Sequence, residues 1–451
     1  MVVVFVLVAV AVLALLVGVH RYVWRRLIGD TTAKGSLARR TGTVAAFVLP
    51  LLSIGALVSS RSGVPFPVQR VLAWPGYLWL AALLYLTLAL LVGEAVRPLL
   101  RRLLARRTAA TDAATEPAAE PAGPDTEPVA ATDAPAAART TTTATATAGG
   151  PGTAPTGGGA LTDLAQRAEP PAPSVADPSR RLFVSRAVGG AAALAGLGTV
   201  GYGTYGVLRG PRTKRITVRL AGLPRSAHGF RIAMVSDIHL GPILGRAHTR
   251  RVVEAINATG PDLVAVVGDL VDGSVADLGT AAEPLSGLEA RHGSYFVTGN
   301  HEYFSGAAEW VDHVRELGLR PLENARVEVA GFDLAGVNDV AGESEGQGPD
   351  FARALGDRDR SRASVLLAHQ PVVIDDAVEY GVGLQLSGHT HGGQLWPGNL
   401  LAELANPTVA GYERYGDTQL YVSRGAGAWG PPVRVGAPSD ITVVELASPL
   451  A

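Results

Sequence analysis

The 451-residue sequence contains no cysteine, which excludes a disulfide framework, a thiolate zinc site and a cysteine nucleophile. Charged residues are also scarce. They make up 18% of the chain, against about 25% in an ordinary soluble domain, whereas hydrophobic residues make up 47%. Part of the chain is therefore expected to lie in lipid. The net charge of −1 gives no basic field, so no nucleic-acid partner is expected.

Three uncharged apolar runs open the sequence, and each is close to the ~20 residues that a helix needs to span a bilayer. They cover Val2–Val19, Thr41–Ser60 and Val71–Gly93. The first run lacks a charged segment before it, so it does not resemble a cleavable signal peptide. Residues 1–107 are therefore predicted to form a transmembrane region of three helices in a multi-pass protein of the cell membrane.

The placement of arginine predicts the orientation of these helices. Basic residues are frequent between the first two runs and again from Arg97 to Arg107, whereas the second connection carries only Arg61 and Arg70. Short cytoplasmic connections carry the excess of Arg and Lys. The N-terminus is therefore predicted to lie outside and the chain after Arg97 in the cytoplasm.

Two further segments precede the remainder of the chain. Residues 108–178 consist largely of Ala, Thr, Pro and Gly and are predicted to be a disordered linker. In residues 179–210, the stretch from Ser179 to Phe183 resembles a twin-arginine export signal, which carries folded domains across a membrane. Export would place the following domain on the extracytoplasmic face. An ordinary fourth membrane helix, or a segment lying on the membrane surface, is the alternative.

From Arg215 onward the pattern changes to that of a globular α/β domain. Short β-rich runs alternate with amphipathic stretches such as His248–Ala258 and Ala307–Leu317, which are typical of helices. The β-rich runs are IAMVSD, LVAVVGD, SYFVTGN, SVLLAHQ, LQLSGHT, QLYVSRG and ITVVEL.

Several of these runs end in a residue that can bind a metal ion. The carboxyl ends of strands are where functional residues gather in open α/β folds. The residues are oxygen and imidazole ligands, which suit Mn, Fe or Zn. There are seven such residues: Asp237, His239, Asp269, Asn300, His369, His389 and His391. Seven ligands are more than one tetrahedral metal site can use, and they fit two ions that share a carboxylate. Two metals ~3.5–4 Å apart form the clamp used for displacement at phosphorus.

The motifs DIH, GDLVDG, GNHE, AHQP and GHTH, in this order, resemble the calcineurin-like metallophosphoesterase superfamily. The resemblance covers roughly residues 215–446. The apolar N-terminal runs and the tail from Arg414 to Ile441 resemble the bacterial membrane-anchored branch of that superfamily. The fold that the resemblance implies is a four-layer α/β/β/α sandwich of two sheets with helices outside.

The resemblance also implies a role for each motif residue. The first metal would be bound by Asp237, His239 and His391, the second by Asn300, His369 and His389, and Asp269 would bridge the two ions. His301 would face the substrate, where it could stabilise charge or protonate the leaving oxygen. Asp272 would orient His301, although a turn-capping role is the alternative for this residue.

Four positions near these motifs bear on the type of phosphatase, on the structure of the site and on the substrate pocket. Gly273 stands where protein serine/threonine phosphatases carry a phosphate-binding arginine, which argues against that activity. Glu302 is expected to be a structural hydrogen-bond partner. Trp396 and Arg424 are expected to border the substrate pocket, and Arg424 would either contact phosphate or form a surface ion pair.

The predicted function is a membrane-anchored, binuclear-metal phosphoesterase. Its expected substrates are phosphomonoesters, phosphodiesters or pyrophosphates, possible partners being lipid-linked or envelope-linked phosphate esters. The alternative from another class is a metal-binding sensor or scaffold without catalysis. A transporter would need ionisable residues inside the apolar runs, and these runs have none. A nuclease would favour a basic groove, which the overall charge does not suggest.

Overall fold

The computed structural model describes residues 2–59, 62–115 and 178–451. Most of the expected linker, residues 108–178, lies outside this range. The chain divides into two compact units: Met1–Pro98 joined with Leu182–Ala451, and Leu99–Arg181. The metal-binding motifs and the apolar N-terminal runs belong to the first unit.

All three apolar runs are helical in the structure, and the segment after the linker is helical as well. The helices are α1 (Val2–Trp24), α2 (Leu37–Ser59), α3 (Phe66–Thr115) and α4 (Pro178–Leu208), with a short π-helix at Arg25–Gly29. In the described residues, these four helices are long and apolar enough to cross a membrane. Helix α3 continues through Thr115, past residue 108, where the linker was expected to begin.

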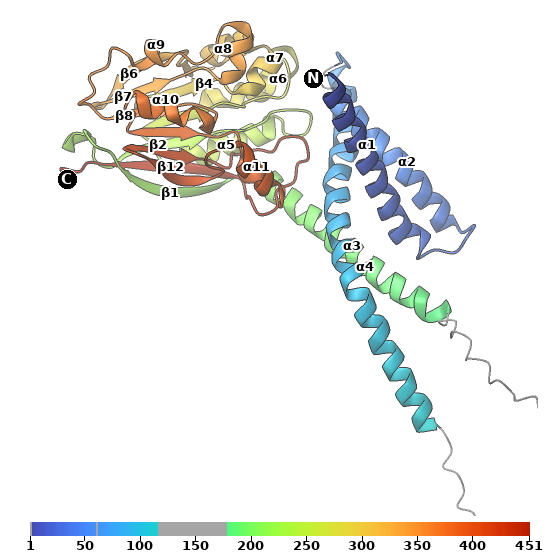
Figure 1. The fold of residues 1–451 in the computed structure, drawn as a ribbon. Coiled ribbons are helices and arrows are strands. Elements are labelled where there is room, and N and C mark those ends of the chain that lie inside the picture. The colour runs from blue at the N-terminus through green and yellow to red at the C-terminus, as the bar shows by residue number, and fades with distance from the viewer. Residues whose placement is uncertain (1, 60–61, 116–177) are drawn as a thin grey trace, which may run out of the picture. The chain divides into compact units, whose positions relative to one another are not determined.

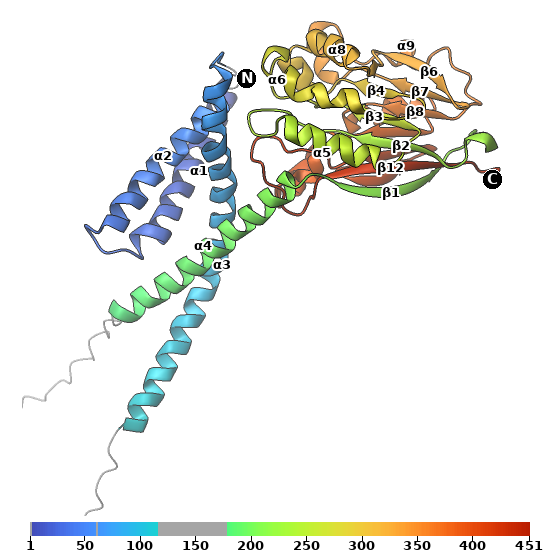
Figure 2. The same ribbon diagram turned by 180° about the vertical axis from the view of Figure 1, so that it is seen from behind.

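Two six-stranded sheets form the α/β domain (Figures 1 and 2). The strand order of the first sheet is β1 (Arg212–Arg219), β12 (Asp440–Ala447), β2 (Phe230–Val235), β3 (Leu263–Val267), β4 (Ser294–Val297) and β5 (Arg320–Pro321). The order of the second sheet is β10 (Gly411–Tyr415), β11 (Thr418–Val422), β9 (Leu384–Ser387), β8 (Ser364–Leu367), β7 (Phe332–Gly336) and β6 (Ala325–Val329).

Seven helices complete the domain, together with short 3-10 turns. They are α5 (Arg246–Asn257), α6 (Val275–Ala282), α7 (Asn300–Ser305), α8 (Ala307–Glu316), α9 (Phe351–Leu355), α10 (Ile374–Glu379) and α11 (Gly398–Ala405). The 3-10 turns are Arg225–Ala227, Glu283–Gly287, Val340–Glu345, Pro371–Val373 and His391–Gly393.

The centre of each sheet is parallel. Strands β2 to β5 run parallel to one another, as do β7, β8, β9 and β11. Strands β12, β10 and β6 are antiparallel to a neighbour. Each of the seven predicted β-rich runs contains a strand, whereas β1, β5, β6, β7 and β10 were not foreseen. Strand β1 starts at Arg212, before the expected start of the domain at Arg215, because it pairs with β12 along its whole length.

The alternation of side chains along the central strands builds the layers. Ile232 and Met234 of β2 lie in the apolar core between the two sheets, with Val365 and Leu367 of β8. Their neighbour Val235 faces the other way, into the cluster with α5, α6 and α8. The outer face of the second sheet packs on α9 and α10. The predicted four-layer α/β/β/α sandwich is therefore confirmed.

Candidate metal centre

The seven expected metal ligands follow the carboxyl ends of parallel strands in both sheets. Asp237 and His239 follow β2, Asp269 follows β3, and Asn300 begins α7 after β4. From the second sheet, His369 follows β8, and His389 and His391 follow β9. The two sheets are stacked, so their strand ends lie at one rim and the ligands meet there.

The first group of ligands consists of Asp237, His239 and His391, which are all buried. The Nε2 atoms of His239 and His391 lie 2.9 Å apart, and Nε2 of His391 lies 3.5 Å from Oδ1 of Asp237. The structure therefore brings together the three residues predicted to bind the first ion.

The second group consists of Asp269, His369 and His389. Nδ1 of His389 lies 2.9 Å from Oδ1 of Asn300, which adds the amide oxygen to this group. Oδ2 of Asp269 lies 3.1 Å from Nε2 of His369 and 3.7 Å from Nε2 of His239. One carboxylate oxygen thus stands between the two groups, which is the position that a bridging ligand needs.

The donors at this rim fit divalent ions. Buried carboxylates and ring nitrogens turned toward one another form a set of donor atoms that can hold cations, which offset the cost of burying the carboxylates. Burial alone would raise the pKa of the Asp269 carboxyl, but the neighbouring His369 and His239 rings lower it below its usual range, so Asp269 is ionised. The set of nitrogen and oxygen donors suits Mn, Fe or Zn.

The backbone at these ligands is unusual. Five of them have positive φ angles between 48° and 71°, in the left-handed region that costs roughly 1–2 kcal/mol for a residue with a Cβ atom. They are Asp237, His239, Asp269, His389 and His391. Strain of this kind gathers at functional sites, where the surrounding fold compensates for it.

The glycines of the motifs allow ligands from different strands to approach closely. A Cβ atom on Gly299 would lie 2.3 Å from Oδ1 of Asp269, and one on Gly388 would lie 2.4 Å from Oδ2 of Asp237. Both distances are shorter than van der Waals contact. The GNHE and GHTH motifs therefore need glycine because a ligand from another loop fills the space.

Glu302 holds two of the ligand loops together. Its buried carboxylate accepts hydrogen bonds from the backbone N–H groups of Asp269, Leu270 and Gly299, at 3.0, 2.8 and 2.6 Å. The expectation of a structural role for this residue is confirmed. These bonds fix the loops after β3 and β4, from which Asp269 and Asn300 project.

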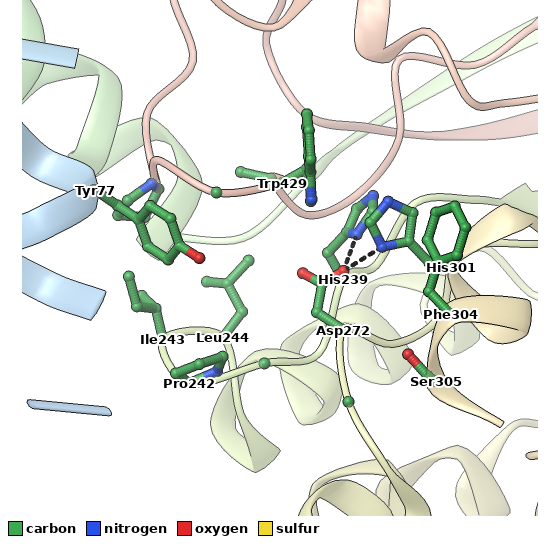
Figure 3. Close-up of a pocket in the computed structure, with 15 residues that line it drawn as sticks. Tyr77, His239, Pro242, Ile243, Leu244, Asp272, His301, Phe304, Ser305 and Trp429 are labelled. Atoms are coloured by element: carbon green, nitrogen blue, oxygen red, sulfur yellow. Dashed lines mark hydrogen bonds and ion pairs between the residues drawn. The ribbon is translucent and has the colours of Figure 1, made fainter. Parts of the chain in front are cut away.

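Asp272 joins the metal ligands to His301 (Figure 3). Its Oδ1 atom accepts from Nδ1 of His239 at 2.9 Å and lies 2.7 Å from Nδ1 of His301. Burial would raise the pKa of the Asp272 carboxyl, but the His239 and His301 rings lower it to about 2. The expected contact with His301 is present, and the contact with His239 was not foreseen.

A further residue, Arg434, was missed by the sequence analysis. Its Nη2 atom lies 2.9 Å from Nδ1 of His391, and its Nε and Nη1 atoms donate to the carbonyls of Gly427 and His391. Burial lowers the pKa of the Arg434 guanidinium to about 10. Arg434 therefore fixes the orientation of the His391 ring at Nδ1, the nitrogen that does not face the other ligands. Arg434 lies outside the five metal-binding motifs, within the tail after position 413, where no local pattern indicates this contact.

A pocket opens beside His301 and Asp272. Phe304 and Trp429 line it, and their rings lie 5.5 and 5.7 Å from the ring of His301 (Figure 3). Both aromatic side chains are largely exposed. A substrate at this pocket would therefore meet an imidazole next to apolar walls.

Arg424 and Trp396 line a second pocket together with Gly392, which follows the ligand His391. Among the residues that the structure describes, Arg424 forms no ion pair, so the surface ion pair considered for it is not found there. Arg424 as a whole is half-buried.

Residues 230–393 match the family described as calcineurin-like phosphoesterase. An uncharacterized metallophosphoesterase of Helicobacter pylori is 38% identical over 256 residues, which cover 56% of this chain and 68% of that protein. An uncharacterized metallophosphoesterase of Bacillus subtilis is 30% identical over 289 residues, covering 60% of this chain and 98% of that protein.

A zebrafish protein described as a transmembrane protein with metallophosphoesterase domain is 38% identical over 259 residues, covering 54% of this chain. The aligned region spans 59% of the zebrafish protein's length. Animal proteins thus match as well as bacterial ones, so the expected assignment to a bacterial branch is not confirmed. The fold, the metal-binding groups and these similarities agree, and the chain belongs to the calcineurin-like phosphoesterase family.

Proposed function

We propose that this chain is a membrane-anchored, two-metal phosphoesterase that hydrolyses phosphomonoester, phosphodiester or pyrophosphate bonds. The observation that carries the proposal is the position of Asp269, whose Oδ2 atom stands between His369 and His239. A carboxylate shared by two ligand groups fits two ions at the spacing used for displacement at phosphorus.

The residues that would hold the ions are those predicted from the motifs. Asp237, His239 and His391 form one group, Asn300, His369 and His389 form the other, and Asp269 serves both. When bound, two divalent ions supply an acidified water as nucleophile and offset the charge of the phosphate.

The contacts of His301 support a role of this residue on the substrate. Its Nδ1 atom is held by Asp272, which leaves Nε2 free to serve as a hydrogen-bond or proton donor to an ester oxygen. We therefore assign His301 the role of stabilising the transition state or protonating the leaving oxygen.

The apolar helices support a membrane location and substrates near a membrane. A tether keeps the enzyme at high local concentration beside surface substrates. Envelope-linked or lipid-linked phosphate esters are the substrate class that this arrangement favours. The arginine distribution and the stretch from Ser179 to Phe183 favour an extracytoplasmic position for the catalytic domain.

The test is hydrolysis by the full chain, purified in detergent and loaded with Mn, of one soluble phosphomonoester and one soluble phosphodiester. Asp269→Ala removes the proposed bridge and is expected to abolish turnover and to lower the bound metal. Asp312→Ala is the matched control, because Asp312 is exposed on α8 and pairs with Arg315.

Turnover that a chelator and Asp269→Ala both abolish, and that Asp312→Ala leaves intact, would support the proposal. Metal binding without turnover on either ester would instead favour the sensor or scaffold. The preferred ester would narrow the class of bond that the enzyme cleaves.

A further inference from the structure

Helix α11 exposes its leucines although it belongs to a well-packed domain. All 8 residues of α11 are at least partly exposed. Leu400, Leu401 and Leu404 are 55%, 71% and 84% exposed, and the preceding Trp396 is 54% exposed. We call these four residues the apolar ridge. A contiguous exposed apolar surface of this kind marks an interaction site.

The ridge has the two-faced character of a helix at a membrane interface. Its leucines are spaced so that they share one side of α11. Asn399 and Glu403, four residues apart, share the other side and bond to each other. Leucine on one face with polar groups on the other, beside a tryptophan, is typical of helices that lie in the plane of a membrane surface. Tryptophan favours the headgroup level.

The start of the ridge is in contact with helices that can cross a membrane. Leu395, next to Trp396, packs in one apolar cluster with Leu86 of α3 and Val200 of α4. The hydroxyl of Tyr85, also on α3, donates to the backbone carbonyl of Trp396 at 2.9 Å. The ridge is therefore continuous with helix surfaces whose own leucines, such as Leu194 of α4, are exposed for lipid.

We propose that Trp396 and α11 are immersed in the surface of the lipid bilayer that the apolar helices cross. The occupant of the ridge is then the boundary between headgroups and acyl chains. The segment from Leu395 to Ala405, which contains α11, would act as a second anchor that fixes the orientation of the catalytic domain against the membrane in addition to its depth.

The position of the ridge also indicates the class of substrate, an inference that rests on the proposed function. Trp396 and α11 residue Asn399 line one pocket with Arg424 and Gly392, and Gly392 follows the ligand His391. This pocket therefore joins the ridge to a metal-binding loop. A phosphate ester carried by a lipid would place its acyl part at the ridge and a headgroup anion at Arg424.

The absence of cysteine from the chain makes the immersion directly testable. Leu401→Cys and Leu404→Cys would each be spin-labelled in the full chain, reconstituted into vesicles of phosphatidylcholine and phosphatidylglycerol. Val378→Cys on α10 is the matched control, since Val378 is an apolar side chain that is 39% exposed on another helix of the same domain.

We expect oxygen, which concentrates in lipid, to relax the labels on α11 more strongly than a water-soluble nickel chelate does. The label at position 378 should show the reverse order. Stronger relaxation by nickel at both α11 positions would overturn the proposal, because the ridge would then face water. Protection from both reagents would also overturn it, because a second copy of the chain would then cover the ridge.

A second measurement addresses the substrate. The triple variant Leu400→Ser, Leu401→Ser, Leu404→Ser is expected to keep its turnover of a soluble ester and to lose at least ~10-fold on a phospholipid in vesicles, because the lost apolar area weakens lipid contact. Val378→Ser should change neither. Equal turnover of the vesicle substrate by the triple variant and the wild type would overturn the link to lipid. Failure of the wild type on every soluble ester would count against the proposed function, while the spin-label result would still decide the immersion.

Discussion

Oδ1 of Asp272 lies 2.7 Å from Nδ1 of His301, and the same oxygen accepts a hydrogen bond from the metal-ligand candidate His239. One carboxylate thus orients both a ring that would bind a metal and a ring that would face the substrate. A shared partner of this kind couples the position of the substrate-facing imidazole to the metal centre.

The shared carboxylate predicts different effects for substitutions at His301 and at Asp272. His301→Gln should lower kcat about 10²–10⁴-fold while the bound metal stays unchanged, because only the proton donor is lost. Asp272→Ala should lower kcat and also weaken metal binding about 10–100-fold, because His239 loses its orienting acceptor. Steady-state kinetics with elemental analysis of the bound metal separates the two effects. A loss of metal in His301→Gln would show that this ring is a ligand instead.

Replacement of Glu302 by glutamine should destabilise the domain. The carboxylate accepts three backbone hydrogen bonds, and an amide offers one oxygen in place of two. At least one buried N–H group would lose its partner, at a cost of about 1–3 kcal/mol. Thermal unfolding in detergent measures this change, and the exposed Glu316→Gln on α8 serves as the control. An unchanged midpoint for Glu302→Gln would contradict the structural role.

His248 on α5 should make the domain sensitive to acid. The ring is buried, and neither of its nitrogens has a hydrogen-bond partner among the described residues. Burial and the nearby Arg251 and Arg434 lower its pKa to about 3, from an ordinary value of 6.5. Between these two values the unfolded state binds the additional proton. The stability that this lowered pKa provides is therefore fully present above pH 6.5 and is lost as the pH falls toward 3.

His248→Leu should remove this part of the pH dependence. The slope that one group contributes is at most about 1.4 kcal/mol per pH unit. Unfolding of the wild type and the variant should be compared from neutral pH downward, with the exposed His228→Gln as the control. Parallel curves for the wild type and His248→Leu would show that the ring takes up no proton on unfolding.

The proposed orientation predicts opposite accessibility for two single cysteines in this cysteine-free chain. Leu450→Cys, near the end of the catalytic domain, should react with a membrane-impermeant maleimide in intact cells. Arg102→Cys, in α3 beyond the third apolar run, should react only after the cells are permeabilised. Both side chains are exposed, so access to the reagent is set by the membrane. Protection of position 450 in intact cells would place the catalytic domain in the cytoplasm.

The sequence by itself determined the identity and the order of the seven candidate ligands. Each follows a buried β-rich run, and Gly299 and Gly388 stand before a ligand because a Cβ atom there would collide with Asp269 or Asp237. These signals are local, since a strand end, a glycine and a ligand are neighbours in the chain. The central strands could be predicted from the sequence for the same reason, because their apolar runs are continuous.

Only the tertiary structure decided which residues support those ligands. Arg434 reaches His391 across 43 positions, and Asp272 reaches His239 across 33, although neither contact has a local pattern. The edge strands β1 and β10 carry exposed polar side chains, so pairing with a neighbouring strand, more than their own composition, defines them. The exposure of the leucines on α11 is likewise a property of the folded surface. Contacts between distant segments depend on how the sheets stack, and this stacking is settled by the packing of the whole core.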